Sequence, residues 1–369
     1  MSAAARDVLI LSRIPGVGSA RLRGLIARFG SARAVETASP ASLCAVEGIE
    51  SKTAASIRSF FRSGAGAEAA RFADRQASRA EQTGAAMLTL WDESYPPLLR
   101  NIYDPPPLLF LRGALTPADA DAVAVVGTRR PSAYGLVMAE RLSSALASCG
   151  ITVASGLARG IDAAAHAACL RSRGRTVAVI GSGLDVMYPA EHRALADAIA
   201  AAGAVLSELP FGSSPDAANF PRRNRIVSGM SLGTVVVETA PAGGAMITAA
   251  MALDEGRDVF AVPSAATAQR PSGTNRLIRE GKAKLTECVD DILAELAPRL
   301  SPRTVRQETR EALSFFEQSL LDALGDEPVH VDVLAARARV APAEALSELL
   351  GLEIKGAVRQ MPGKRFVRA

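Results

Sequence analysis

The chain of 369 residues is 49% hydrophobic and 22% charged, a balance typical of a globular protein with two to three domains and a sizeable core. No run of 18 or more apolar residues is free of charge, which excludes a membrane-spanning helix on length, and we expect no membrane partner. Four cysteines stand singly and three histidines are dispersed, so we expect neither a disulfide framework nor a metal site.

The formal net charge is +4, and nearly all of the positive charge is arginine, since the chain has only five lysines. Alanine is abundant too, and both residues have GC-rich codons, so the positions of the arginines are more informative than their number. The basic balance permits a polyanionic partner without requiring one. Residues 1–7 show no charged leader followed by an apolar run, and we therefore expect a cytoplasmic protein.

Residues 1–66 are predicted to form a small all-helical domain. Residues 14–18 (IPGVG) open an amphipathic helix, and a weaker copy at 46–50 (VEGIE) precedes another. The pattern resembles the helix-hairpin-helix motif of SAM-like domains, whose turn aims backbone N–H groups at a phosphate without reading sequence. The second copy has no second glycine and carries Glu47 and Glu50, which would repel phosphate. Phosphate binding and a small helical interaction domain both remain open.

Residues 67–297 are predicted to form an extended Rossmann-like domain, an α/β fold with a doubly wound parallel sheet. The segment 91–107 is too rich in proline for regular structure. Short apolar runs then alternate with helical patterns, which is the order of a parallel α/β sheet. The predicted strands are Ala122–Val126, Ile151–Ala154, Val177–Ile180, Ala204–Leu206, Thr234–Val237 and Val259–Val262. The predicted helices lie at 136–148, 161–172, 191–202, 222–230, 245–255 and 274–280.

A polar linker is predicted at 298–310, and a winged-helix domain at 311–369. Helical patterns lie at 311–325, 331–338 and 342–352, and a hairpin at 356–368 turns near Pro362-Gly363. Three helices followed by a β-ribbon are the layout of a winged helix.

The predicted recognition helix of this winged helix is acidic. It carries Glu344, Glu348 and Glu353 and no arginine, whereas a helix that enters the major groove of DNA should be positive. The basic residues lie on the predicted wing instead, namely Arg359, Lys364, Arg365 and Arg368. Contacts with DNA and contacts with protein therefore both remain open for this domain.

Doubly wound sheets bind ligands beyond the carboxyl ends of their strands. Five loops, at 127–130, 155–160, 181–185, 220–225 and 243–248, are expected at that edge. Two of them combine glycine with arginine, two carry glycine alone, and one carries three arginines. Glycine lets the backbone approach an anion, and helix N-termini donate free N–H groups to it. We therefore predict a phosphate-binding rim, and as its DNA-binding residues Gly127, Thr128, Arg129, Arg130, Ser155, Gly156, Arg159, Gly181, Ser182, Gly183, Phe220, Arg222, Arg223, Asn224, Arg225, Gly243, Gly244 and Thr248.

The arginines of this rim are too many for one mononucleotide, and they suit a strand of several nucleotides. Phe220, at the head of the arginine-rich motif, is the predicted platform on which a base stacks. Tyr134 and Tyr188 are weaker stacking candidates, because either could pack beneath its own loop.

No catalytic residue and no cofactor is predicted. Residues 181–183 supply half of a G-x-G-x-x-G motif, since Val186 stands at the third glycine position, and no P-loop motif occurs. Glu238 is the carboxylate nearest to the glycine loop, and it is better explained as the partner of a helix terminus or of an arginine. Arg225 has a second interpretation too, as a brace for Asp185 or Glu238.

Six motifs of the α/β part resemble the DNA-processing protein A (DprA, also Smf) family, in the family's order and spacing. They are VGTRRPSAYG at 126–135, SGLARGIDAAAH at 155–166, GSGLDVMYP at 181–189, NFPRRNRIVSG at 219–229, GRDVFAVP at 256–263 and GTNRLI at 273–278. The flanking parts match the family in layout. The resemblance implies a homodimeric, non-enzymatic protein that binds single-stranded DNA and delivers it to the RecA recombinase, notably during natural transformation.

The chain departs from the family pattern in two places. Residues 243–245 are Gly-Gly-Ala where the family usually has a serine, and Ala217 and Ala218 stand where some relatives have a lysine. These departures put the affinity at that end of the groove in question.

Two functions from other classes remain as alternatives. A nucleotide hydrolase of the phosphoribohydrolase type would need a glutamate in its G-G-x-G-T-x-x-E loop, and residues 243–251 contain none. A ligand-sensing transcription regulator would use the winged helix on duplex DNA, which the acidic recognition helix disfavours. Hydrolysis assays and selection of duplex sequences discriminate between these functions.

Overall fold

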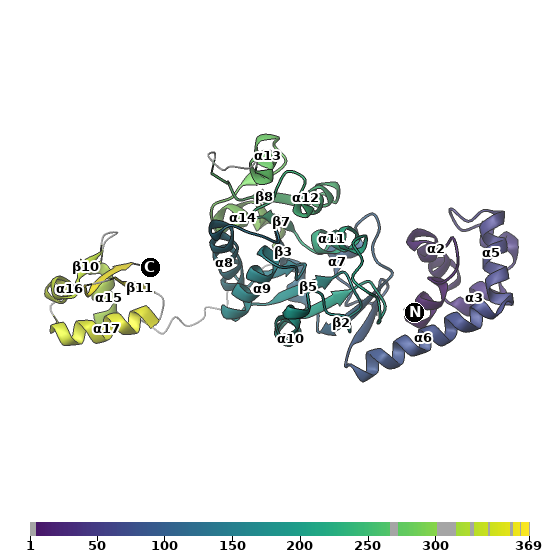
Figure 1. The fold of residues 1–369 in the computed structure, drawn as a ribbon, viewed down its shortest axis with the longest axis horizontal. Helices are drawn as coiled ribbons and strands as arrows, with labels where there is room; N and C mark the ends of the chain where they lie inside the picture. The colour runs from purple at the N-terminus through teal and green to yellow at the C-terminus, as the bar shows by residue number, and fades with distance from the viewer. Residues whose placement is uncertain are drawn as a thin grey trace. The chain divides into compact units, whose positions relative to one another are not determined.

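The computed structural model describes residues 5–265, 272–300, 315–324, 328–338, 340–354, 357–361 and 363–368. The chain forms two compact units, Met1–Ser301 and Pro302–Ala369 (Figure 1), and each has a hydrophobic core of its own. The predicted linker, 298–310, lies outside the described residues from 301 onward. Among the helices that are described, none combines the length and the apolar character that crossing a bilayer requires.

The first unit begins with helices, as predicted from the sequence. They are α1 (Ala5–Leu11), α2 (Ser19–Phe29), α3 (Ala32–Thr37), α4 (Pro40–Cys44), α5 (Ser51–Arg62) and α6 (Gly64–Gln82). Gly16 and Gly48 occupy the two hairpin turns with φ of +80° and +74°, a left-handed conformation that glycine adopts without strain. Alanines of α6 share a core cluster with Phe110 of the sheet. The predicted domain boundary at 66/67 falls inside α6 and stays a prediction.

Among the described residues, a nine-stranded sheet follows in the order β1-β2-β6-β5-β4-β3-β7-β8-β9. The strands are β1 (Ala86–Thr89), β2 (Leu108–Gly113), β3 (Ala122–Val126), β4 (Thr152–Ser155), β5 (Thr176–Ile180), β6 (Ala204–Ser207), β7 (Gly233–Val236), β8 (Asp258–Ala261) and β9 (Lys284–Leu285). Each of the six predicted strands lies within one residue of its predicted bounds. Short Val- and Ile-rich runs mark strands buried on both faces, which is why they were predictable.

The sheet is mostly parallel, as predicted, and two antiparallel strands that were not predicted lie at one edge. Strands β3 to β9 pair in parallel, but β2 pairs antiparallel with β6, and β1 pairs antiparallel with β2. The prolines of 96–107 end directly before β2, whose residues Leu108–Leu111 are buried. The expectation of no regular structure over 91–107 is wrong at one place, because the short helix α7 (Pro97–Arg100) lies within the segment, with proline in its first turn. The strand directly after Pro107 was missed. The short edge strand β9 was missed as well.

Helices cover both faces of the sheet, which confirms the doubly wound architecture (Figure 1). They are α7 (Pro97–Arg100), α8 (Ala133–Ser148), α9 (Ile161–Arg171), α10 (Arg193–Ala202), α11 (Asn219–Gly229), α12 (Gly244–Asp254), α13 (Gly273–Arg279) and α14 (Val289–Leu296). Residues of α8, α9 and α14 share one core cluster, and residues of α11 and α12 share another. The strand order reverses between β3 and β7, and this switch point is where open α/β sheets bind ligands.

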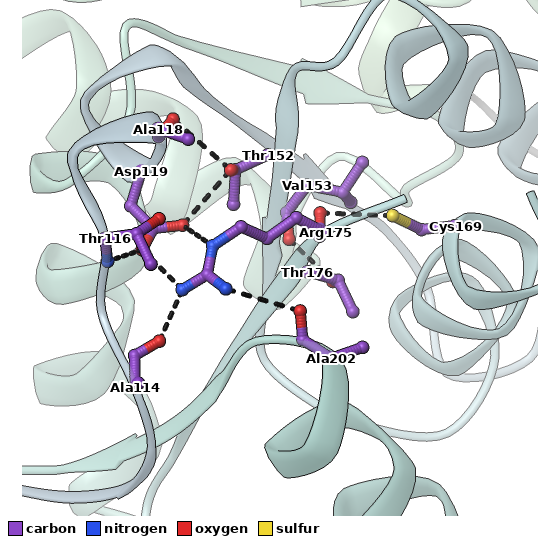
Figure 2. A network of polar contacts seen from close by, with 10 residues as sticks. All are labelled: Ala114, Thr116, Ala118, Asp119, Thr152, Val153, Cys169, Arg175, Thr176 and Ala202. Carbon is purple, nitrogen blue, oxygen red and sulfur yellow. Dashed lines mark hydrogen bonds and ion pairs between the residues drawn. The ribbon is translucent and has the colours of Figure 1, made fainter. Parts of the chain in front are cut away.

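At the opposite, amino end of the strands, a polar network joins the segment before β3 to β4 and β5 (Figure 2). The side chain of Asp119 is 4% exposed. Arg175 donates to both of its carboxylate oxygens, with Nε and Nη2 each 2.7 Å away. Thr152 donates to the same carboxylate from 3.1 Å, and Arg175 also donates to the carbonyls of Ala114 and Ala202. One arginine therefore holds four segments of the chain together.

The second unit is a winged helix, as predicted. It contains α15 (Phe315–Ala323), α16 (Val331–Ala338), α17 (Pro342–Ile354) and the strands β10 (Val329–His330), β11 (Val358–Met361) and β12 (Arg365–Arg368), paired in the order β10-β12-β11. The predicted helix at 311–325 is described only from Phe315 to Leu324, and Gly356 and Pro362 of the predicted hairpin lie outside the described residues.

Candidate nucleic-acid interface

A cavity of about 860 Å³ opens at the switch point between β3 and β7. Its walls come from the loops after β3, β4 and β7 and from the N-terminal turns of α11 and α12. Eleven of the predicted residues line it, namely Gly127, Thr128, Arg129, Arg130, Gly156, Phe220, Arg223, Asn224, Gly243, Gly244 and Thr248. Arg159, Gly181 and Arg222 line two smaller hollows that share residues with it. The carboxyl edge thus brings together most of the residues predicted to bind there.

Three of the predicted residues lie within the loops instead of on the cavity. The Ser155 hydroxyl is buried and donates to the Val125 carbonyl at 2.6 Å. Ser182 donates its hydroxyl to Val186 in the same manner, and the Gly183 N–H donates to Ser213. These residues fix the shape of the loops, because small hydroxyl side chains readily satisfy nearby backbone groups.

Arg225 also points away from the cavity. Its side chain is 12% exposed and lies 2.5 Å from a carboxylate oxygen of Glu208. It also donates to the carbonyl of Asp104 at 2.6 Å. Arg225 therefore braces an acidic side chain, as its second interpretation expected. That side chain is Glu208, and not Asp185 or Glu238. Asp185 instead accepts from Arg79 of α6 at 3.2 Å.

Arg223 forms the floor of the cavity. It is 7% exposed and donates from Nη1 to the Val179 carbonyl at 2.8 Å, while its Nε has no partner among the described residues. Burial lowers the pKa of its guanidinium, and burial raises the pKa of the neighbouring Asp162 carboxyl. Gly156 makes room for this arginine, since a Cβ at Gly156 would lie 1.6 Å from Nη1. Asp162 was missed from the sequence, although a carboxylate in the first turn after a glycine loop is a recognisable signal.

Three arginines are exposed and have no ion-pair partner within the described part of the chain, namely Arg129 and Arg130 at the cavity and Arg222 at the adjoining hollow. After burial, the charge of Arg129 is a further cause that lowers the pKa of Arg223, and both residues line the cavity. Arg159 differs, because it pairs with Glu191 at 2.5 Å and its hydrogen bond lowers the pKa of that carboxyl. Both partners are more than half exposed, and exposed pairs are weak enough to exchange for a phosphate.

Phe220 presents its ring between charged and aromatic neighbours. The Arg129 guanidinium lies 5.1 Å from the ring centroid, and the Tyr188 ring lies 5.7 Å away at an angle of 45°. Behind it, a Cβ at Gly181 would lie 3.2 Å from a ring carbon. The glycine therefore lets the ring pack against the loop after β5. An aromatic ring held in this way beside free cations can stack a base whose phosphate the cations bind.

The N-terminus of α12 faces the same cavity. Gly243 precedes the helix without a side-chain cap, and Gly244 and Ala245 line the cavity wall. The first N–H groups of a helix have no partner within the helix, and they favour anions. Glycine at these positions leaves the backbone accessible to a ligand.

Glu238 is the partner of a helix N-terminus, which is one of the two roles that the sequence analysis favoured for it. Its carboxylate accepts the Ser132 N–H at 3.1 Å and the Ser132 hydroxyl at 2.7 Å, directly before α8. Within the described ranges, no group of three or more His, Cys, Asp or Glu side chains could hold a metal ion.

Comparison with known proteins gives the family. The model of DNA recombination-mediator protein A matches residues 86–297, the DprA winged-helix model matches 306–364, and a SAM-like helix-hairpin-helix tandem matches 8–63. Protein Smf of Synechocystis is 35% identical over 98% of each chain. The structure of DprA from Streptococcus pneumoniae has a TM-score of 0.67 at 33% identity, over 80% of this chain and 99% of that one. DNA processing protein A of Helicobacter pylori, whose structure is described for its single-stranded DNA binding mode, has a TM-score of 0.53 at 27% identity, over 59% of this chain and 97% of that one. The chain belongs to the DNA recombination-mediator protein A (DprA) family.

Proposed function

We propose that the chain binds single-stranded DNA along the carboxyl edge of its sheet. The observation that carries this proposal is a set of exposed arginines without an ion-pair partner among the described residues. Arg129 and Arg130 line the cavity beside the Phe220 ring, and Arg222 lines an adjoining hollow. The arginines and the uncapped N-terminus of α12 suit several phosphates of one backbone. The ring suits an unstacked base, which a single strand offers and a duplex withholds. The Helicobacter pylori relative described for single-stranded DNA binding supports the same ligand.

Membership of the family supports a finer role as a proposal. We propose that the protein acts as a homodimer in the cytoplasm and delivers the bound strand to the RecA recombinase during recombination and natural transformation. RecA hydrolyses ATP when it polymerises on single strands. On DNA covered by single-strand-binding protein, we expect ATP hydrolysis to begin sooner when this chain is added. An unchanged lag, measured with a chain that binds the DNA, would contradict delivery.

The ligand class is tested by competition between strands. We expect labelled oligo-dT to bind much more tightly than a duplex of the same length at equal salt. Equal affinity for both would contradict the stacking role of Phe220, since a paired base offers its face to no side chain.

Deleting residues 311–369 is expected to leave single-strand affinity largely unchanged. All residues of the cavity precede the deletion, and the core of the second unit contains no residue of the first. Fluorescence anisotropy of labelled oligo-dT measures the effect, with light scattering to verify folding and mass. Loss of binding by a folded, dimeric truncated protein would place the DNA site elsewhere.

No hydrolysis of nucleoside monophosphates is expected. Glu238 is hydrogen-bonded to Ser132, and no P-loop lysine or loop glutamate is present in the sequence. Chromatographic detection of released base and phosphate checks this expectation. Turnover that copurifies with the chain and disappears in Glu238→Gln would overturn it, provided that Ser132→Ala keeps the activity. Ser132→Ala removes the hydroxyl that donates to Glu238 and leaves the carboxylate in place.

A further inference from the structure

Tyr103 stands out among the described residues as the most exposed large hydrophobic side chain, at 98%. It lies between α7 and β2, outside the predicted rim. Single exposed apolar residues are common on protein surfaces and carry no meaning alone. Tyr103 differs from such residues because hydrogen bonds fix the backbone that carries its ring.

Five consecutive carbonyls of the loop that begins at Tyr103 accept hydrogen bonds. Arg23 of α2 donates to the carbonyls of Tyr103 and Pro105 at 3.5 and 3.2 Å, and to the Asp104 carboxylate at 2.8 Å. Arg225 of α11 donates to the Asp104 carbonyl at 2.6 Å. The hydroxyl of buried Tyr95 donates to Pro106 at 2.8 Å, and the Leu90 N–H donates to Pro107 at 3.0 Å. Three prolines restrict the loop further. The loop is therefore fixed before any ligand arrives, and it holds the ring in water at a defined place.

The loop lies beside the arginine-bearing face of α11. Arg225, which contacts Asp104, comes three residues after the free Arg222, and residues three apart share a face of a helix. At 1.5 Å of rise per residue, Arg222 and Arg225 are separated by about 4.5 Å along the axis. A strand that leaves the cavity at Phe220 and follows this face passes Arg222 and then reaches the Tyr103 loop.

The charges near Tyr103 favour contact with a base over contact with a phosphate. Arg23 pairs with Asp104, and Arg225 pairs with Glu208. Both guanidiniums are therefore neutralised, and each also donates a hydrogen bond to a carbonyl of the loop. An exposed ring on a fixed loop without free charge beside it offers its π-face, on which bases of any sequence stack.

We infer that Tyr103 is a second stacking platform for the same DNA strand, reached by nucleotides that leave the cavity along α11. The inference rests on the proposed function and extends it to a longer track. Because the ring is already held in place, stacking on it requires little further ordering of the protein.

The test compares Tyr103→Leu with Tyr103→Phe over a length series of oligo-dT. Loss of the ring is expected to weaken binding of long oligonucleotides about fivefold or more, from the stacking value of about 1–3 kcal/mol per base. The shortest oligonucleotides that bind should be unaffected, and the salt dependence should not change. Tyr103→Phe should bind like the parent. Equal melting temperatures show that both variants fold.

A second readout is photocrosslinking with one 5-iododeoxyuridine placed along the oligonucleotide. Crosslinks to Tyr103 are expected at a fixed number of nucleotides from the position that crosslinks to Phe220. If Tyr103→Leu binds every length like the parent and no crosslink reaches residue 103, while Phe220→Leu still weakens binding, the inference is wrong and the proposed function stands. If the parent fails to bind oligo-dT, both are wrong. A Tyr103→Leu variant that keeps parental DNA affinity but no longer stimulates the recombinase would assign the ring to a protein contact and overturn the inference.

Discussion

Arg175→Met is expected to lower the free energy of unfolding of the first unit by about 3–5 kcal/mol, the usual effect of removing one partner of a buried ion pair. Asp119 is 4% exposed and would keep only the hydrogen bonds from Thr152 and from the Thr116 N–H. The carbonyls of Ala114 and Ala202 would lose their donor as well. Equilibrium unfolding in urea measures the change. Trp91, the single tryptophan of the chain, lies in this unit and reports on it alone.

The matched control is Arg171→Met. Arg171 pairs with Glu140 at 3.3 Å, and both side chains are at least half exposed, so its loss should cost about 0–1 kcal/mol. Below the unfolding transition, both variants should bind oligo-dT like the parent, because the Arg175 network lies at the end of the sheet opposite to the cavity. Equal stability of the two variants would show that the network does not fix the strands.

Phe220→Leu is expected to weaken binding of oligo-dT by about 1–3 kcal/mol, or roughly 5- to 150-fold, since it removes the face on which a base stacks. Leucine keeps much of the volume that packs against Gly181, so the loop after β5 should keep its shape. Affinity is measured by titration at fixed salt. The salt dependence should change little, because the substitution removes no charge.

Phe220→Tyr keeps the ring and should bind close to the parent. This control separates stacking from general disturbance of the loop. Parental affinity of Phe220→Leu would mean that no base stacks on this ring. An equal loss in both variants would mean that Phe220 acts through packing alone.

The sequence predicted the strands and loops of the fold well because their signals are local. A buried parallel strand such as Ala122–Val126 is a short β-branched or small apolar run, and a glycine-arginine stretch after it is visible without knowledge of the fold. The edge strands β1 and β2 gave no such signal. Strand β2 pairs antiparallel with β6, and β1 pairs antiparallel with β2. Both pairings depend on where the chain returns after the proline-rich segment, which local patterns do not contain.

The arginines show a second limit of prediction from sequence. Arg222, Arg223 and Arg225 are adjacent in the sequence, yet the first is exposed, the second is buried under Gly156, and the third pairs with Glu208. Their directions follow from successive rotations of about 100° around α11 and from the partner that each rotation meets. Helical periodicity predicts the rotations, but the partners come from tertiary packing.

Tyr103 is another residue whose environment cannot be predicted from the sequence around it. Nothing near it in the sequence marks it as different from Tyr95, which is buried with its hydroxyl bonded to Pro106. Tyr95 packs in the core of the sheet, whereas the loop at Tyr103 is held by arginines of α2 and α11 that are distant in the sequence.

The central claim, that the free arginines hold the phosphates of a single strand, is tested most directly by the salt dependence of oligo-dT affinity. Three free arginines, or four if Arg159 leaves Glu191, predict a slope of log affinity against log salt between about −2 and −3, at about −0.7 per phosphate on single strands. Arg222→Ala should flatten the slope by about 0.7. Arg141→Ala, which removes an equal charge from the exposed side of α8 about 12 Å beyond its first residue, should leave it unchanged. A slope near zero, or equal changes in both variants, would contradict the account.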